Sequence, residues 1–185
     1  PLENGRIHIS RAAQQAIFPA RFQLIAAMNP CPCGYLGSRV RTCRCTPDQV
    51  SRYQGKLSGP LLDRIDLHIE VPALPPDELM HAAPGESSAT VRARVQTART
   101  QAITRQQCPN AALQGQALEA AVQLPDDAAR FLQAAAVQLG WSARAMHRIL
   151  RVARTIADLA ASHRVETAHV AEAIQMRRGL SAVQP

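Results

Sequence analysis

The sequence predicts a mixed α/β part followed by an all-α helical bundle, and three observations support this division. Short runs with the two-residue alternation of β-strands occur before residue 72. From residue 88 onward, apolar residues recur at helical spacing. Prolines and a glycine interrupt both patterns between these two parts, which is typical of a linker. We therefore expect an α/β part at 1–72, a linker at 73–87 and a helical domain at 88–185.

The first part contains the segments expected to form a sheet. Strand-like patterns occur at Arg6–Ser10, at 17–20 as the returning strand of a hairpin, at 22–27 as a buried central strand, and at 66–71. A helix is expected from Pro47 to Leu57, because Thr46 is a good N-cap residue.

The second part is expected to contain five helices. They begin at Ser88 or Thr90, at about Ala117, at Pro125, after Ser142 and after Thr167. In the last helix, Val170, Ala173 and Ile174 are expected to face the core. Hydrophobic residues make up 46% of the chain but aromatic residues only 3%, and alanine is the main contributor. This composition is typical of helices that pack closely together.

Composition also limits the classes of partner. No apolar run approaches the roughly 20 residues needed to span a bilayer, so we expect a cytoplasmic protein with no membrane partner. The formal net charge is +7, which is compatible with a polyanionic partner. Nearly all cations are arginines, since Lys56 is the only lysine.

Four of the five cysteines lie within fifteen residues, as two Cys-x-Cys pairs on either side of a nine-residue loop: Cys31, Cys33, Cys43 and Cys45. Zn²⁺ in structural sites takes four ligands, with thiolate sulfurs about 2.3 Å away. The pattern therefore predicts a structural zinc site within residues 28–46, whose negative charge is offset by Arg39, Arg41 and Arg44. Two alternatives remain, namely one or two disulfides, or reduced thiols that bind no metal. Cys108 is expected to be a spare thiol.

Three motifs carry a resemblance to a known family. Residues 22–34 read FQLIAAMNPCPCG, residues 57–72 read LSGPLLDRIDLHIEVP, and residues 142–159 read SARAMHRILRVARTIADL. Together they resemble the magnesium-chelatase-like AAA+ ATPases, in particular the subgroup of bacterial competence proteins. The resemblance covers essentially the whole chain. It implies the end of an AAA+ core followed by a helical lid.

The resemblance also implies which part of such a protein this is. No Gly-x-x-x-x-Gly-Lys-Ser/Thr phosphate loop and no acidic Walker B strand ending occur in the 185 residues. We therefore expect the C-terminal part of an ATPase that binds ATP with Mg²⁺. Alone, this part is expected to be inactive.

Three residues match catalytic positions of the family. The resemblance implies that Asn29 is the sensor-1 residue, that Arg64 is the arginine finger, and that Arg144 is the sensor-2 arginine that contacts the γ-phosphate. Each has a simpler alternative. Asn29 would cap the turn before Pro30, and Arg64 would pair with Asp63 or Asp66 on a surface turn. Arg144 would belong to a solvated helix face with its neighbours His147, Arg148, Arg151 and Arg154.

The hairpin expected at the start of the chain matches the pre-sensor-1 hairpin of this clade, which points into the pore of a ring. Arg6, His8 and Arg11 are thus candidates for contacting a nucleic-acid backbone. The leading interpretation is a hexameric AAA+ motor acting on DNA, as a helicase or in branch migration. The alternatives are a chelatase-type motor that remodels a protein partner, and a non-catalytic zinc-bearing module that binds nucleic acid or protein.

Overall fold

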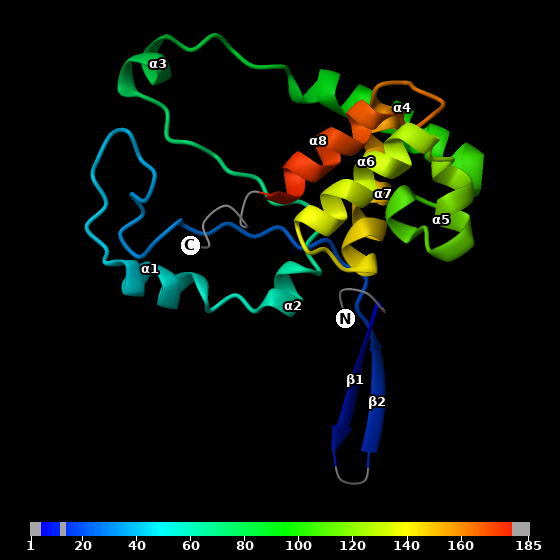
Figure 1. Ribbon diagram of the computed structural model, residues 1–185, viewed down its shortest axis with the longest axis horizontal. Helices are drawn as coiled ribbons and strands as arrows, with labels where there is room; N and C mark the ends of the chain where they lie inside the picture. Colours follow the sequence, from blue (N-terminus) through cyan, green and yellow to red (C-terminus); the bar gives the residue numbers. More distant parts are fainter. Residues whose placement is uncertain (1–4, 12–13, 179–185) are drawn as a thin grey trace. The chain divides into compact units, whose positions relative to one another are not determined.

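The computed structural model describes residues 5–11 and 14–178, and the chain divides into two units between Ile65 and Asp66 (Figure 1). We describe each unit by itself. None of the helices in the described part of the chain is both long and apolar enough to cross a bilayer.

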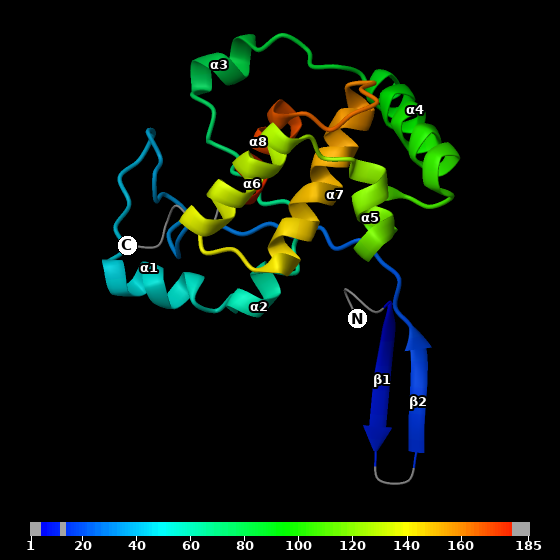
Figure 2. The same ribbon diagram turned by 45° about the vertical axis from the view of Figure 1, so that its right-hand side comes forward.

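The first unit begins with the expected hairpin, which the structure confirms. Strand β1 (Arg6–Arg11) pairs antiparallel with β2 (Gln14–Pro19), as Figures 1 and 2 show. The pairing runs from Arg6 opposite Pro19 to Arg11 opposite Gln14. At the base of the hairpin, the backbone N–H of Ala20 donates to the carbonyl of Gly5 at 2.8 Å. All described side chains of the two strands are exposed.

The predictions of strands at 22–27 and 66–71 are wrong for this structure. Among the described residues, the only sheet is the two-stranded hairpin, so neither segment has a neighbouring strand with which to form a ladder. Residues 22–27 are irregular and exposed. The other segment bonds to helices instead of strands. Asp66 pairs with Arg148 at 2.6 Å, and the backbone N–H of His68 donates to the carbonyl of Met176 at 2.6 Å.

Helix α1 (Pro47–Gln54) confirms the predicted start of the helix. Thr46 accepts a hydrogen bond from the backbone N–H of Gln49, and the Gln49 side chain accepts one from the backbone N–H of Thr46. This reciprocal pair satisfies two backbone donors that the first turn leaves free. The helix ends three residues before the expected Leu57, and a short helix α2 (Gly59–Leu62), capped by Ser58, follows.

The second unit contains the expected five helices together with two short elements. The five expected helices are α4 (Ser88–Gln106), α5 (Gly115–Val122), α6 (Asp126–Gln138), α7 (Ala143–Leu159) and α8 (Thr167–Arg178). The two short elements are helix α3 (Pro76–His81) and a 3₁₀ turn at Asn110–Ala112. Helix α3 was not predicted, because its segment is rich in proline. Serines cap two helices, since the Ser87 hydroxyl accepts from Thr90 and the Ser142 hydroxyl accepts from Ala145. Thr167 is the first residue of α8 rather than its cap.

The core of this unit surrounds α7, which packs against α4, α5 and α8 (Figure 2). Ala153 and Ala157 of α7 are completely buried, so neighbouring helices approach its backbone closely. The expected inward face of α8 is confirmed by the burial of Val170, Ala173 and Ile174.

A buried carboxylate connects four segments of the second unit. The side chain of Asp158, near the end of α7, is 2% exposed. Arg105 of α4 donates to both of its oxygens at 2.7 and 3.0 Å, and Asn110 of the 3₁₀ turn donates at 2.8 Å. Arg154, one turn earlier on α7, lies 2.9 Å away. The guanidinium of Arg154 also donates to the carbonyls of residues 162 and 163, which holds the loop after α7.

We expected the basic residues of α7 other than Arg144 to be solvated or to lie at a subunit interface, and a solvated position is wrong for two of them. Arg148 is 5% exposed and Arg154 only 1% exposed, because both guanidinium groups pair with carboxylates. Helical spacing alone gave no sign of this, since the partner Asp66 lies far away in the sequence. The pair of Arg154 and Asp158, four residues apart, was visible in the sequence.

Replacing Asp158 by asparagine should lower the free energy of unfolding of the helical unit by about 3–5 kcal/mol, because Arg154 then remains buried without its opposite charge. Glu86→Gln is the matched control. It breaks an ion pair with Arg94 in which both side chains are about half exposed, so it should cost less than about 1 kcal/mol. Urea unfolding followed by circular dichroism measures both. Equal losses in the two variants would contradict the structural role of Asp158.

The stabilisation by Asp158 should also depend on pH. Burial opposes its ionisation, but hydrogen bonds from Arg105 and Asn110 and the charge of Arg154 hold its pKa below the usual range. The contribution is therefore complete above the unfolded pKa of about 3.9, and is lost as the pH falls through the lower folded pKa. The difference in unfolding free energy between the wild type and Asp158→Asn should shrink on acidification, since a protonated Asp158 resembles asparagine. A difference that stays constant from pH 7 down to the acid transition would refute this assignment.

Candidate functional site

The cysteine cluster is built on tight turns. The backbone N–H of Gly34 donates to the carbonyl of Cys31 at 3.0 Å, which closes the first turn between the cysteines. Gly34 and Gly37 have φ angles of +81° and +74°, a conformation that side chains with a Cβ rarely adopt. The Gln54 side chain of α1 donates to the carbonyl of Pro30 at 2.9 Å, which attaches the cluster to the helix.

The four sulfur atoms lie close enough together to bind one metal ion. The Sγ atoms of Cys31, Cys33 and Cys43 lie 3.4, 3.5 and 3.7 Å from one another, and with Cys45 all four lie within 4.8 Å. Four sulfurs bound tetrahedrally at about 2.3 Å would be separated by roughly 3.8 Å. The sulfurs are free thiols, and Cys31 is completely buried. The geometry therefore fits a metal ion with four sulfur ligands.

Hydrogen bonds and burial act on these thiols in opposite directions. Backbone N–H groups of Arg44 and Tyr35 lower the pKa of Cys33 to about 6. Burial and the neighbouring cysteine side chains raise the pKa of Cys45 to about 12. Four adjacent thiols do not all ionise without a compensating cation, because each thiolate disfavours the next. A divalent cation would supply that compensation, and it would keep all four sulfurs as thiolates.

Asn29 lies directly before this cluster rather than at the end of a strand. It is exposed, and a Cβ placed on Gly34 would lie 3.7 Å from its side-chain Cγ. The asparagine side chain thus lies beside the turn that carries the first cysteine pair. The role of Asn29 as sensor 1 stays a prediction.

Arg64 and Arg144 both lie close to a helix terminus. Arg64 follows α2, and its guanidinium donates to the carbonyl of Pro60 at 2.7 Å. Arg144 is exposed in the first turn of α7, directly after the cap formed by Ser142. The surface-turn alternative for Arg64 is likewise untested, and its candidate partner Asp66 pairs with Arg148. The catalytic roles of both arginines stay predictions.

The hairpin divides its three candidate residues between its two faces. Successive side chains of a strand alternate, so Arg6 and His8 lie on one face and Arg11 lies on the other. The face with Arg11 also carries Ile7 and Ile9, which are 39% and 46% exposed. Sequence reasoning missed Arg21, which follows the hairpin and lies close to Arg6 at its base. The recurrence of arginine within and just after the predicted hairpin was the feature of the sequence that could have pointed to Arg21.

The fold and the site define a protein with a two-stranded hairpin and a four-cysteine cluster, followed along the chain by a helical domain. Two adjacent family models then match the chain. The model described as magnesium chelatase, subunit ChlI, matches residues 1–79, and that described as magnesium chelatase, subunit ChlI C-terminal, matches residues 85–177. The chain belongs to this magnesium-chelatase-like family.

Individual relatives agree with the resemblance expected from the motifs. The chain is 48% identical over 179 residues to the YifB protein of Salmonella typhimurium, covering 96% of the chain and 35% of the relative. It is 47% identical over 186 residues to the competence protein ComM of Haemophilus influenzae, covering 100% of the chain and 36% of the relative. A Mycobacterium tuberculosis protein is 40% identical over 183 residues, covering 96% of the chain and 36% of the relative. The chain thus spans about a third of the length of these curated relatives.

When the chain is purified from cells under reducing conditions, it should carry about one equivalent of a divalent metal ion. Inductively coupled plasma mass spectrometry measures the metal content. Cys31→Ser should lose it, since Cys31 is buried among the other three sulfurs. Cys108→Ser is the matched control and should retain the metal, because Cys108 lies outside the cluster. Metal-free wild-type protein whose four cluster cysteines are all rapidly alkylated in the native state would eliminate the site.

Proposed function

We propose that this chain forms the C-terminal part of an AAA+ ATPase that assembles into a hexameric ring and acts on DNA, as a helicase or in branch migration. The complete protein would bind ATP with Mg²⁺. Asn29 would orient the attacking water as sensor 1, Arg64 would act on the neighbouring subunit's nucleotide, and Arg144 would contact the γ-phosphate. The match of two adjacent chelatase family models along nearly the whole chain carries this proposal.

The position of Arg144 adds support. Arg144 is an exposed residue in the first turn of a capped helix. Helix α7 is fixed in turn by the buried Asp158. A lid with a rigid helix and an exposed terminal arginine can bring positive charge to a phosphate when it closes.

Exposed apolar segments support a larger α/β core. Phe22 and Ile25 are 56% and 84% exposed, and Ile69 and Val71 are 71% and 85% exposed. These are the segments whose patterns predicted strands. Additional strands in the complete protein would pair with them and remove their apolar side chains from water.

A DNA partner is supported by the charge distribution. The chain has a net charge of +7, and no acidic residue occurs between Gly5 and Pro47. An exposed hairpin within this basic segment is suited to contacting phosphates. The four-cysteine cluster would hold a structural Zn²⁺ ion, because thiolates select this ion over harder divalent cations. Zinc there would order the turns of residues 28–46 without taking part in ATP hydrolysis.

A protein-remodelling motor is the second candidate, because both matching family models are named after a magnesium chelatase subunit. Stimulation of ATP hydrolysis distinguishes the two proposals. A DNA motor should hydrolyse ATP faster when DNA is added.

In the complete protein, Arg64→Ala should lower the kcat of ATP hydrolysis by roughly 10³-fold or more, while nucleotide affinity changes little. An arginine finger acts mainly on the transition state, so binding of the ground state is preserved. Arg52→Ala is the matched control, because it removes an exposed arginine from α1 of the same unit. Equal activity of the two variants would exclude Arg64 from catalysis.

A mixing experiment tests whether Arg64 acts on a neighbouring subunit. Subunits carrying Arg64→Ala are combined with subunits that lack the phosphate-loop lysine. Mixed rings should regain part of the activity, since an intact finger then faces an intact nucleotide site across one interface. Mixed rings that form but stay inactive at every ratio would argue that Arg64 does not act in this way.

A further inference from the structure

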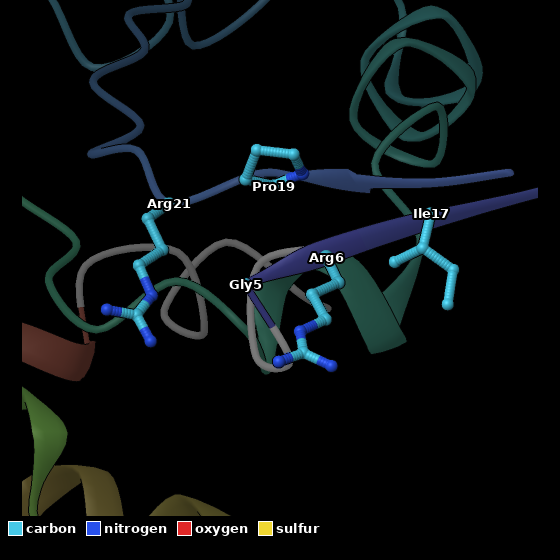
Figure 3. Close-up of a pocket in the computed structure, with 5 residues that line it drawn as sticks. All are labelled: Gly5, Arg6, Ile17, Pro19 and Arg21. Atoms are coloured by element: carbon cyan, nitrogen blue, oxygen red, sulfur yellow. The ribbon is translucent and has the colours of Figure 1, made fainter.

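A shallow hollow lies at the base of the hairpin, on the face that carries Arg6. It has a volume of about 460 Å³ and is lined by five residues: Gly5, Arg6, Ile17, Pro19 and Arg21. Figure 3 shows the side chains of Arg6 and Arg21 extending on the same side of the hairpin base. The hollow is large enough for a phosphate group with its attached sugar.

The backbone at the base brings the two arginines together. The hydrogen bond from Ala20 to Gly5 closes the hairpin, so Arg21 returns beside the start of β1. Gly5 has a φ angle of +60°, and a Cβ at this position would lie 3.1 Å from the Cγ of Arg21. The absence of a side chain at Gly5 therefore allows the stem of Arg21 to lie across the backbone next to Arg6.

The charges at this place are uncompensated within the described part of the chain. Neither Arg6 nor Arg21 forms an ion pair with another described residue. Two guanidinium groups near one another repel, and an anion between them removes the repulsion. Arginine is suited to this role because its planar fork donates two parallel hydrogen bonds to a phosphate.

Apolar and polar residues beside the two arginines would also contact a ligand in the hollow. Ile17 is 58% exposed, and with Pro19 it forms the apolar side of the hollow. His8 lies opposite Ile17 in the register, on the same face. The face thus runs from two arginines, past an apolar surface, to a histidine. A chain of phosphates joined by sugars has the matching alternation of charged and less polar groups.

We propose that Arg6 and Arg21 together form a phosphate-binding site for the backbone of single-stranded nucleic acid at the base of the hairpin. The site rests on the proposed nucleic-acid role and adds a residue, Arg21, together with a defined place of contact. One phosphodiester binds between the two guanidinium groups, and its sugar lies against Ile17 and Pro19. The strand then continues along the face of His8, which leaves Arg11 on the opposite face outside this site.

Salt-dependent binding of a fluorescein-labelled oligothymidylate of about thirty nucleotides to the 185-residue chain tests the site. Each lost phosphate contact lowers the slope of log affinity against log salt by about 0.7 for single strands. Because the site holds one phosphodiester between the two guanidinium groups, the double variant R6A/R21A should lower the slope by about 0.7, and either single variant should lower it by less. The control R52A/R92A removes two exposed arginines from α1 and α4, and should change the slope much less.

The possible results separate this inference from the proposed function. If the wild-type chain does not bind the oligonucleotide even at low salt, the hairpin site falls, whereas the proposed function of the complete ring is tested separately by stimulation of its ATP hydrolysis with DNA. If the wild type binds but R6A/R21A matches R52A/R92A, only the hairpin site falls. Circular dichroism of all variants should match the wild type, because the exchanged side chains are exposed.

A second measurement distinguishes nucleic acid from free phosphate and needs no variant. Phenylglyoxal modifies accessible arginines, and mass spectrometry of peptides reports each site. The oligonucleotide should protect Arg6 and Arg21 but not Arg52. Inorganic phosphate at an equal phosphate concentration should leave both exposed to the reagent. Protection by inorganic phosphate alone would overturn the assignment to a nucleic-acid backbone.

Discussion

The helical unit depends on one buried carboxylate. Asp158 accepts hydrogen bonds from α4 and from the 3₁₀ turn, and it pairs with Arg154 of its own helix. A buried charge is tolerated only when its partners are in place, so each of these segments has one favourable position relative to α7. The apolar core alone specifies less, because about half of its described buried residues are alanines, which pack similarly in several registers. The carboxylate thus orients α7, and with it the terminal turn that presents Arg144.

The first unit is held together by different means. Among the described residues before Asp66, Cys31 is the only one that is fully buried, so this unit has almost no apolar core of its own. Its order comes from the backbone ladder of the hairpin, the capped helix α1 and the turns around the cysteines. A metal ion bound by four thiolates would contribute the stability that such a small unit cannot obtain from apolar burial. The cluster and Asp158 therefore play comparable parts, each supplying order where hydrophobic contacts are weak.

The features predictable from sequence are those encoded within a few neighbouring residues. Thr46 and Ser142 cap helices as expected, and the two Cys-x-Cys pairs meet because a short loop joins them. Strands at 22–27 and 66–71 were not predictable in the same way, since a strand exists only beside another strand. The burial of Arg148 was equally inaccessible, because it depends on Asp66, eighty-two positions earlier. For the candidate site, the meeting of the four cysteines was thus predictable, whereas the position of Arg21 beside the start of β1 depends on the hydrogen bond that closes the hairpin.

The arginines of the first unit have different surroundings in the cysteine loop and at the base of the hairpin. Zn²⁺ on four thiolates would leave an excess of negative charge, and three arginines of the cysteine loop lie close enough in sequence to offset it: Arg39, Arg41 and Arg44. One of them is already engaged, since Arg41 stacks 4.8 Å from the centre of the Tyr35 ring and its guanidinium donates to the Tyr35 hydroxyl. The positive charges of these three arginines would therefore be largely offset by the thiolates of the cluster. The arginines at the hairpin base have no such negative neighbour among the described residues. Their field extends into solvent, so an incoming phosphate would be attracted to the hairpin rather than to the cysteine loop.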